Sequence, residues 1–253
     1  MGEQRDAGKT QGGSSNDVMA GWPRTIAEAR RVQEELSGRV MISPLRRPVT
    51  IVAGVDAAFS GDKTVAAAVL FDLETMSCIE QAYHVMPTRF PYIPGYLSFR
   101  EGEALIAALG ALRRQPDVIM VDGQGIAHPR GMGIASFLGV VLAMPTIGCA
   151  KSRLVGEYRE PPPGKGSWSE LMLKGETVGA VVRSRDRVKP LFVSPGHLVT
   201  LGDCIELVLR CCTRYRIPEP VREADGLSKR IKREIDTAGP PGKGRGDNSP
   251  LTP

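Results

Sequence analysis

Residues 49–86, VTIVAGVDAAFSGDKTVAAAVLFDLETMSCIEQAYHVM, contain three β-like segments in close succession. The segments are VTIVAGVDAAF (49–59), TVAAAVLFDL (64–73) and SCIEQAYHVM (77–86). Their connections, SGDK and ETM, are short and turn-forming, as in hairpins that join antiparallel neighbours. This part of the chain therefore predicts three antiparallel strands near the start of the folded region.

The segments on either side alternate between helical and strand-like patterns. The expected elements are a helix at 25–40 with Thr25 as its N-cap, helix 98–114, strand 117–122, helix 133–144, strand 145–150, a hairpin within 168–183, strand 189–194, and helices 203–215 and 219–235. This order is similar to that of the ribonuclease H-like fold. We therefore expect a single α/β domain with a mixed sheet flanked by helices, although strand order alone carries little weight.

Composition narrows the class of protein. Residues 1–20 and 236–253 are rich in Gly, Pro, Ser and charge, which predicts disordered tails around a catalytic domain at 21–235. The five cysteines show no CxxC spacing and are expected to be reduced core residues. Neither a signal peptide nor a membrane-length apolar segment is found, so we expect a cytoplasmic protein with no membrane partner. A net charge of +5 suits a polyanionic partner such as nucleic acid.

Three acidic residues are candidates for a metal site. Asp56 lies inside an apolar strand, Glu101 in the first turn of a predicted helix, and Asp122 at the end of a short strand. Each has an ordinary alternative: a bond from Asp56 to the turn at 60–61, a favourable helix dipole for Glu101, and an Asx-turn for Asp122. In a ribonuclease H-like sheet these positions converge, and three converging carboxylates need a divalent cation. Oxygen ligands favour Mg²⁺ or Mn²⁺, and such a site can hydrolyse a phosphodiester.

Four segments carry the most specific pattern. They are GVDAAF (54–59), PYIPGYLSFRE (91–101), VDGQGIAHPRGMGIASFLG (121–139) with AKSRLVG (150–156), and FVSPGHLVTL (192–201). Together they resemble the endonuclease V family of inosine-directed nucleases, over about residues 25–235. Without this resemblance, 91–101 reads as a rigid surface connection leading into a helix.

The resemblance implies roles for individual residues. Asp56, Glu101 and Asp122 would bind Mg²⁺, for which Mn²⁺ could substitute. Lys151 would hold or polarise the scissile phosphate, and its alternative is a solvated loop lysine. His197 would complete the catalytic site by contacting metal-bound water or that phosphate, and its alternative is a hydrogen bond at a helix entry.

The resemblance also implies a DNA-binding segment and a base pocket. Tyr92 would fill the gap left by a flipped nucleotide, because extrusion of a base costs a few kcal/mol of stacking. The DNA-binding segment is Pro91, Tyr92, Ile93 and Pro94, with the prolines stiffening the backbone. The residues expected to line the pocket for hypoxanthine are Gly95, Leu97, Gly123 and Ile134. His128 is expected to be a structural hydrogen-bonding residue.

The implied activity is repair of DNA that contains deoxyinosine. A monomeric enzyme would hydrolyse the second phosphodiester 3′ to the lesion, leaving 3′-hydroxyl and 5′-phosphate ends. Two alternatives stay open: cleavage of inosine-containing RNA, and non-catalytic binding of deaminated or branched nucleic acid. The basic run KRIKR at 229–233 is either a solvated helix face or a phosphate contact.

Overall fold

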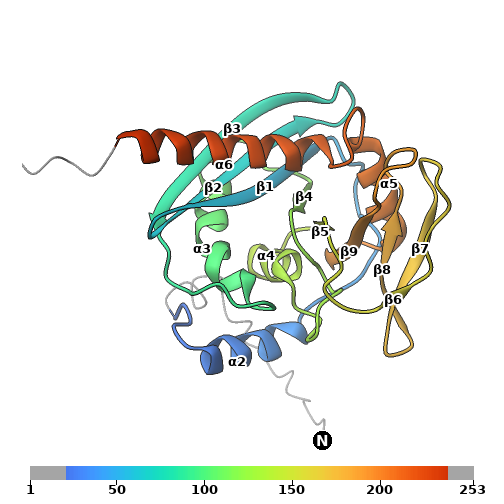
Figure 1. The fold of residues 1–253 in the computed structure, drawn as a ribbon, viewed down its shortest axis with the longest axis horizontal. Coiled ribbons are helices and arrows are strands. Elements are labelled where there is room, and N and C mark those ends of the chain that lie inside the picture. The colour runs from blue at the N-terminus through green and yellow to red at the C-terminus, as the bar shows by residue number, and fades with distance from the viewer. Residues whose placement is uncertain (1–20, 239–253) are drawn as a thin grey trace, which may run out of the picture.

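The computed structural model describes residues 21–238, in which one twisted sheet carries helices on both faces (Figure 1). The strands of this part are β1 (Ile51–Ser60), β2 (Lys63–Asp72), β3 (Ser77–Pro87), β4 (Val118–Val121), β5 (Thr146–Ala150), β6 (Glu157–Tyr158), β7 (Trp168–Leu173), β8 (Glu176–Val182) and β9 (Leu191–His197). The helices are α2 (Ile26–Ser37), α3 (Leu97–Gly110), α4 (Ile134–Leu142), α5 (Leu201–Cys211) and α6 (Glu219–Ala238). The strand order across the sheet is β3-β2-β1-β4-β5-β9-β8-β7-β6.

The sheet is mixed, as the sequence predicts. Strands β1, β2 and β3 pair antiparallel through the two short connections. Strands β1, β4 and β5 run parallel, and β9 returns antiparallel to β5. The carboxyl ends of β1, β4 and β5 therefore point toward the same edge of the sheet, where ligand sites form in open α/β folds.

Both faces of the central strands are buried. Helices α2, α3 and α4 share one apolar cluster with Ala53 and Val55 of β1. Helices α5 and α6 pack on the other face, against Val52 and Val65. Successive side chains of a strand point to opposite faces, so β1 is apolar along most of its length. A carboxylate within this strand therefore requires a partner or a functional role.

Most predicted elements are found, with differences at their ends. Thr25 forms a capping box with Glu28 at the start of α2, as expected. Strand β9 continues to His197, α5 already ends at Cys211, and the two-residue strand β6 was not predicted. Helix α6 runs to Ala238, so residues 236–238 are helical and not part of a tail. The rest of both predicted tails lies outside the described residues.

The cysteines follow the prediction with one exception. All five are free, and Cys149, Cys204, Cys211 and Cys212 are buried. Cys78 is exposed, because β3 is the outermost strand of the sheet and is only partly covered. Within residues 21–238, the structure contains no helix with the length and apolar character needed to span a membrane.

Candidate active site

The parallel register of β1 and β4 places two of the predicted carboxylates next to each other. Val55 pairs with Val121, so Asp56 and Asp122 follow at the same level of the sheet. Asp122 N donates to Val55 O at 3.4 Å, which continues the pairing by one residue. Asp56 does not bond to the turn at 60–61; its Oδ2 accepts a hydrogen bond from Ser228 Oγ on α6 at 3.4 Å.

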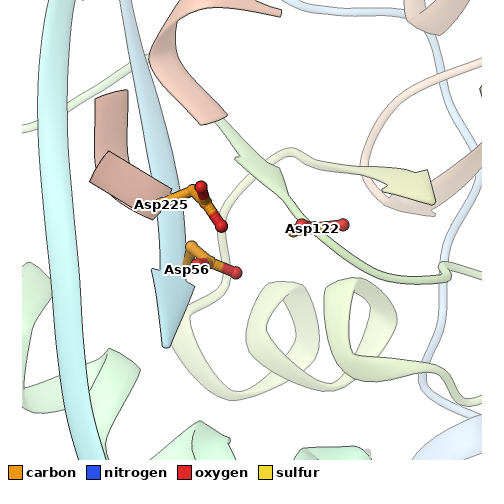
Figure 2. A group of neighbouring side chains, drawn as sticks. All are labelled: Asp56, Asp122 and Asp225. Atoms are coloured by element: carbon orange, nitrogen blue, oxygen red, sulfur yellow. The ribbon is translucent and has the colours of Figure 1, made fainter. Parts of the chain in front are cut away.

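A third carboxylate comes from α6. A Cβ atom at Gly54 would lie 2.0 Å from the carbonyl carbon of Pro220, so only glycine allows α6 to approach β1 this closely. Asp225, five residues after Pro220, therefore lies over the end of β1. One carboxylate oxygen each from Asp56, Asp122 and Asp225 lies within 4.8 Å of the other two (Figure 2). Three chain segments thus bring their oxygen atoms to one point.

The protein balances the charges of these carboxylates only in part: Lys151 Nζ pairs with Asp122, and Lys229 Nζ lies 2.8 Å from Asp225 Oδ2. Burial, together with the nearby charges of Asp122 and Asp225, raises the pKa of Asp56 to about 7, against the opposing effect of Lys151. Burial also raises the pKa of Glu101 well above its ordinary value, with further contributions from Asp56 and Asp122. Oxygen ligands crowded in this way fit a hard divalent cation, which would relieve the repulsion.

Glu101 is close to this group but differs from the prediction in its position on the helix. Helix α3 begins at Leu97, so Glu101 lies in the second turn and no acidic residue occupies the first. The helix dipole therefore does not explain this carboxylate. The residue is 9% exposed, and it is not among those whose oxygens converge within 4.8 Å. Its role as a ligand stays a prediction.

Lys151 follows β5 and points to the carboxylates. Its Nζ donates to Asp122 Oδ2 and lies 4.0 Å from Asp225 Oδ1. Burial alone would lower the pKa of Lys151, but the bond to Asp122 and the neighbouring carboxylates raise it. The side chain remains 46% exposed, so its ammonium group is paired yet accessible from solvent.

The structure corrects the expected position of His197. This residue pairs with Thr146, which pairs in turn with Ile119, three residues before Asp122 on β4. The backbone of His197 is therefore set roughly 10 Å back along the strands from that of Asp122. It is buried, and its Nδ1 accepts a hydrogen bond from Met41 N at 3.1 Å. His197 thus connects a neighbouring segment to the sheet, away from the acidic group.

Asp225, which the sequence did not single out, lies with Asp56 and Asp122, whereas His197 does not. The basic composition of 219–235 drew attention to its exposed face. Asp225 lies on the buried face of α6. It follows the buried Val221 by one turn and precedes Ser228, which is also buried, by one turn. A carboxylate on the apolar stripe of a helix is unusual and could have identified this residue.

The segment 91–94 projects from the surface as predicted. Tyr92 is 70% exposed, whereas Phe90 and Tyr96 on either side are buried, with ring centroids 6.4 Å apart. Arg100 Nη1 donates to Phe90 O at 3.0 Å and fixes the start of the segment. An exposed tyrosine is thus held between two buried aromatic anchors. Pro91 and Pro94 are exposed and Ile93 is partly buried.

A cavity of about 340 Å³ opens beside Tyr92 and Asp122. The four residues expected to form a pocket, Gly95, Leu97, Gly123 and Ile134, all line it, as do Tyr92, Ile93, Pro94 and Lys151. A Cβ at Gly123 would lie 2.4 Å from Ile134 Cγ2, so glycine is needed for this wall. The predicted pocket residues are therefore brought together next to the carboxylates.

His128 supports the pocket wall through hydrogen bonds. Its Nδ1 accepts from Arg130 N at 3.2 Å, and its Nε2 lies 3.0 Å from Gly95 O. Burial lowers the pKa of His128 to about 4, so the ring is neutral at physiological pH and Nε2 carries the proton that Gly95 O accepts. The expected structural role agrees with these contacts.

Comparison with known proteins identifies a family. The profile of the endonuclease V family matches residues 34–226. The chain is 50% identical over 210 residues to endonuclease V of Geotalea uraniireducens, covering 83% of this chain and 90% of the relative. The crystal structure of endonuclease V from Streptomyces avermitilis has a TM-score of 0.82 and 44% identity, covering 85% of this chain and 96% of that one.

A third relative was solved with nucleic acid. Endonuclease V of Ciona intestinalis, in complex with a 24mer DNA containing an inosine followed by a ribo-adenosine, has a TM-score of 0.73 and 30% identity. The match covers 83% of this chain and 98% of that one. These likenesses confirm the predicted ribonuclease H-like fold. The family profile, the identity over most of the chain and the shared fold agree: the protein belongs to the endonuclease V family.

Proposed function

We propose that the protein is a monomeric, Mg²⁺-dependent DNA repair endonuclease that recognises deoxyinosine. It hydrolyses the second phosphodiester 3′ to the lesion and leaves 3′-hydroxyl and 5′-phosphate ends. The observation that carries the proposal is the convergence of Asp56, Asp122 and Asp225 beside a pocket that Asp122 itself lines. The Ciona relative, bound to inosine-containing DNA, supports the same substrate class.

The three aspartates would hold the Mg²⁺ ion, with Glu101 next to them. When bound, the ion would lower the pKa of the attacking water and offset charge on the leaving 3′-oxygen. Asp56 and Asp122 are fixed by the register of two parallel strands, and Asp225 by the close packing of α6 on Gly54. This rigid placement keeps the oxygens together before substrate arrives.

Lys151 would hold the scissile phosphate. Its ammonium group carries a full charge, is half-exposed, and already lies between Asp122 and Asp225. A phosphate oxygen can bind such a point charge from the solvent side while Asp122 keeps the side chain in place. We expect Lys151→Met to lower the cleavage rate more than it lowers the affinity for DNA.

Tyr92 would occupy the space of the extruded nucleotide, and the cavity beside it would take the base. A ring exposed on a short segment between two buried aromatic residues can enter the stack without the loss of core contacts. The pocket volume of about 340 Å³ lies within the range of small-ligand sites. Gly95, Leu97, Gly123 and Ile134 would surround the hypoxanthine ring.

A duplex with one deoxyinosine and a 5′ label on that strand tests the proposal. With Mg²⁺ we expect one nick, one nucleotide beyond the lesion's own 3′ phosphodiester, and none in a matched adenine duplex. Asp122→Asn should lower the rate at least about a hundred-fold while the protein still binds the lesion. No nick, or a nick that persists with excess chelator, would contradict the proposal. A nick that the wild type makes and Asp122→Asn does not make would also exclude a non-catalytic binder.

One observation favours RNA as a second substrate. The Ciona relative was captured with a ribonucleotide directly after inosine. Matched single strands that differ only in the sugar at that position decide whether this chain uses a 2′-hydroxyl. Equal rates would place selectivity in the base pocket, whereas cleavage restricted to the ribonucleotide strand would make the protein an endoribonuclease.

A further inference from the structure

The carbonyl oxygen of Gly95 accepts hydrogen bonds from three buried or partly buried side chains. Gln33 Nε2 donates at 2.9 Å, His128 Nε2 at 3.0 Å and Arg130 Nη2 at 3.0 Å. The donors come from α2 and from the loop after β4, which are far apart in the sequence. A carbonyl oxygen has two lone pairs and needs only one or two donors to be satisfied. Three converging donors therefore fix its position as well as satisfying it.

The three side chains are also fixed to one another. Arg130 Nε donates to Gln33 Oε1 at 2.7 Å, and Arg130 N donates to His128 Nδ1 at 3.2 Å. Gln33 Nε2 also lies 3.2 Å from Met132 O. Gln33 is 0% and His128 3% exposed, whereas Arg130 is partly buried, so water has limited access to these bonds. Such networks, when every member is satisfied, give rigidity to the groups they hold.

The fixed carbonyl of Gly95 belongs to segment 91–95, which carries Tyr92 and part of the pocket wall in the proposed function. Gly95 lines the cavity and has a φ of +81°, a left-handed conformation. Tyr92 stands three residues before it. The Arg130 guanidinium also stacks on Tyr96, 4.5 Å from the ring centroid. The network therefore holds the point where the exposed segment meets the pocket wall.

We propose that Gln33, His128 and Arg130 form a clamp on Gly95 O that positions residues 91–95 for extrusion of the base. The inference rests on the proposed function and adds three positioning residues to it. None of the three belongs to the acidic group at Asp56, Asp122 and Asp225. These residues act through the backbone, because the clamp keeps Tyr92 and the pocket wall in the positions that they take when the base is extruded. Preorganisation of this kind lowers the cost of ordering a loop on binding.

The test uses a duplex with deoxyinosine next to 2-aminopurine, whose fluorescence rises when it loses its stacking partners. Arg130→Met and Gln33→Met remove clamp donors and keep side-chain volume. At saturating protein, we expect each variant to lower the fluorescence rise and the single-turnover nicking rate about ten-fold, since small misplacements are costly at such sites. Affinity for an undamaged duplex should stay within about two-fold, because the phosphate contacts remain.

Arg183→Met is the matched control. Arg183 also donates to a main-chain carbonyl, Val188 O, but lies at the junction of β8 and β9, outside the pocket lining. It should cost stability yet leave the fluorescence rise and the nicking rate unchanged. If one clamp variant does not fold, the other still decides, because each removes a donor to the same carbonyl.

The outcomes are distinguishable. Folded clamp variants with the wild-type fluorescence rise and nicking rate would overturn the clamp and leave the proposed function standing. A wild-type protein that neither unstacks nor nicks the inosine duplex would overturn the proposed function, and the clamp with it. Equal losses in Arg183→Met would show that general destabilisation, and not the clamp, explains the effect.

Discussion

At the scale of single residues, the carboxylate of Asp56 is in electrostatic conflict with its surroundings. It is enclosed by β1 and α6 and faces Asp122 and Asp225, so its charged form is disfavoured in the metal-free protein. A cation in this position would stabilise the charged form and reverse the effect. The Asp56 carboxylate therefore lowers the stability of the folded protein when no cation is bound, and it contributes to the affinity for the cation.

This conflict predicts how stability depends on pH. The folded-state pKa of Asp56 is about 7 against an ordinary value of 3.8, so the folded protein keeps a proton that the unfolded chain loses. The stability from protonated Asp56 is present below about pH 4 and is lost as the pH rises to about 7. The amide introduced by Asp56→Asn would not titrate. With chelator, the unfolding midpoint of Asp56→Asn minus that of wild type should increase from pH 4 to 7 and then stay level.

Asp117→Asn provides a control of opposite sign. Although burial opposes the shift, hydrogen bonds from Ile51 N and Thr50 hold the pKa of Asp117 below its ordinary value. The stability that the charged Asp117 carboxylate contributes is lost as the pH falls. Asp117→Asn should therefore cost more stability at pH 7 than near pH 3. A pH-independent difference for Asp56→Asn would contradict the assigned charge repulsion.

Residue chemistry in the sequence identified most of the site but not all of it. Asp56 and Asp122 were predictable because a carboxylate in or just after an apolar strand conflicts with its surroundings. His197 was misplaced because the likeness of its segment to the family suggested the assignment. The antiparallel pairing of β9 with β5 instead points this end of β9 away from the carboxylates. Asp225 was missed because its position in the site depends on the contact between α6 and β1, which are distant in the chain.

At the scale of elements, the packing of α6 on β1 determines whether the third carboxylate reaches the site. Gly54 lies against the backbone of Pro220 and Val221, with no room for a side chain. Gly226, on the exposed side of the same helix, has no atom within 4 Å of an ideal Cβ. A side chain is therefore excluded at Gly54, inside the helix–strand contact, and has room at Gly226, outside it.

These glycines give a matched pair of variants. Gly54→Ala should lower the free energy of unfolding by at least about 2 kcal/mol and displace α6 together with Asp225, because the overlap is with backbone. Gly226→Ala should raise it by about 0.5–1 kcal/mol, since alanine favours the helix. Urea unfolding measures both. A Gly54→Ala protein as stable and as active as wild type would contradict the close packing.

The elements themselves were largely predictable, because β1, β2, α3 and α4 have clear apolar patterns. Strand β6 was not, since its two residues pair only with β7 and carry no pattern of their own. The end of α6 was placed too early for a similar reason. Asp236 accepts a hydrogen bond from Ser60 on β1, and this tertiary contact lies beyond local sequence preference.

At the scale of the whole molecule, a net charge of +5 adds attraction for nucleic acid of any sequence. In the proposed function, the glycine-lined wall of the pocket would contact the base, and Tyr92 would fill the gap that the base leaves. General attraction and lesion recognition therefore depend on different forces, and salt should separate them.

Salt is expected to weaken binding more than chemistry. Between about 50 and about 200 mM salt, affinity for an undamaged duplex should fall at least ten-fold, because phosphate contacts release counterions. The single-turnover nicking rate at saturating protein should change by less than about three-fold over the same range. Fluorescence anisotropy and quenched-flow cleavage measure the two. A salt-independent affinity would contradict a phosphate-dominated interface.

In the proposed active site, carboxylates from three distant segments share one divalent cation. Crystals soaked in Mn²⁺ and measured at the manganese absorption edge test it most directly. We expect an anomalous peak within coordination distance of Asp56, Asp122 and Asp225, weakened or lost in Asp225→Asn and retained in Asp236→Asn. A fully soaked crystal with no peak at this position, or with Mn²⁺ bound only elsewhere, would contradict the claim.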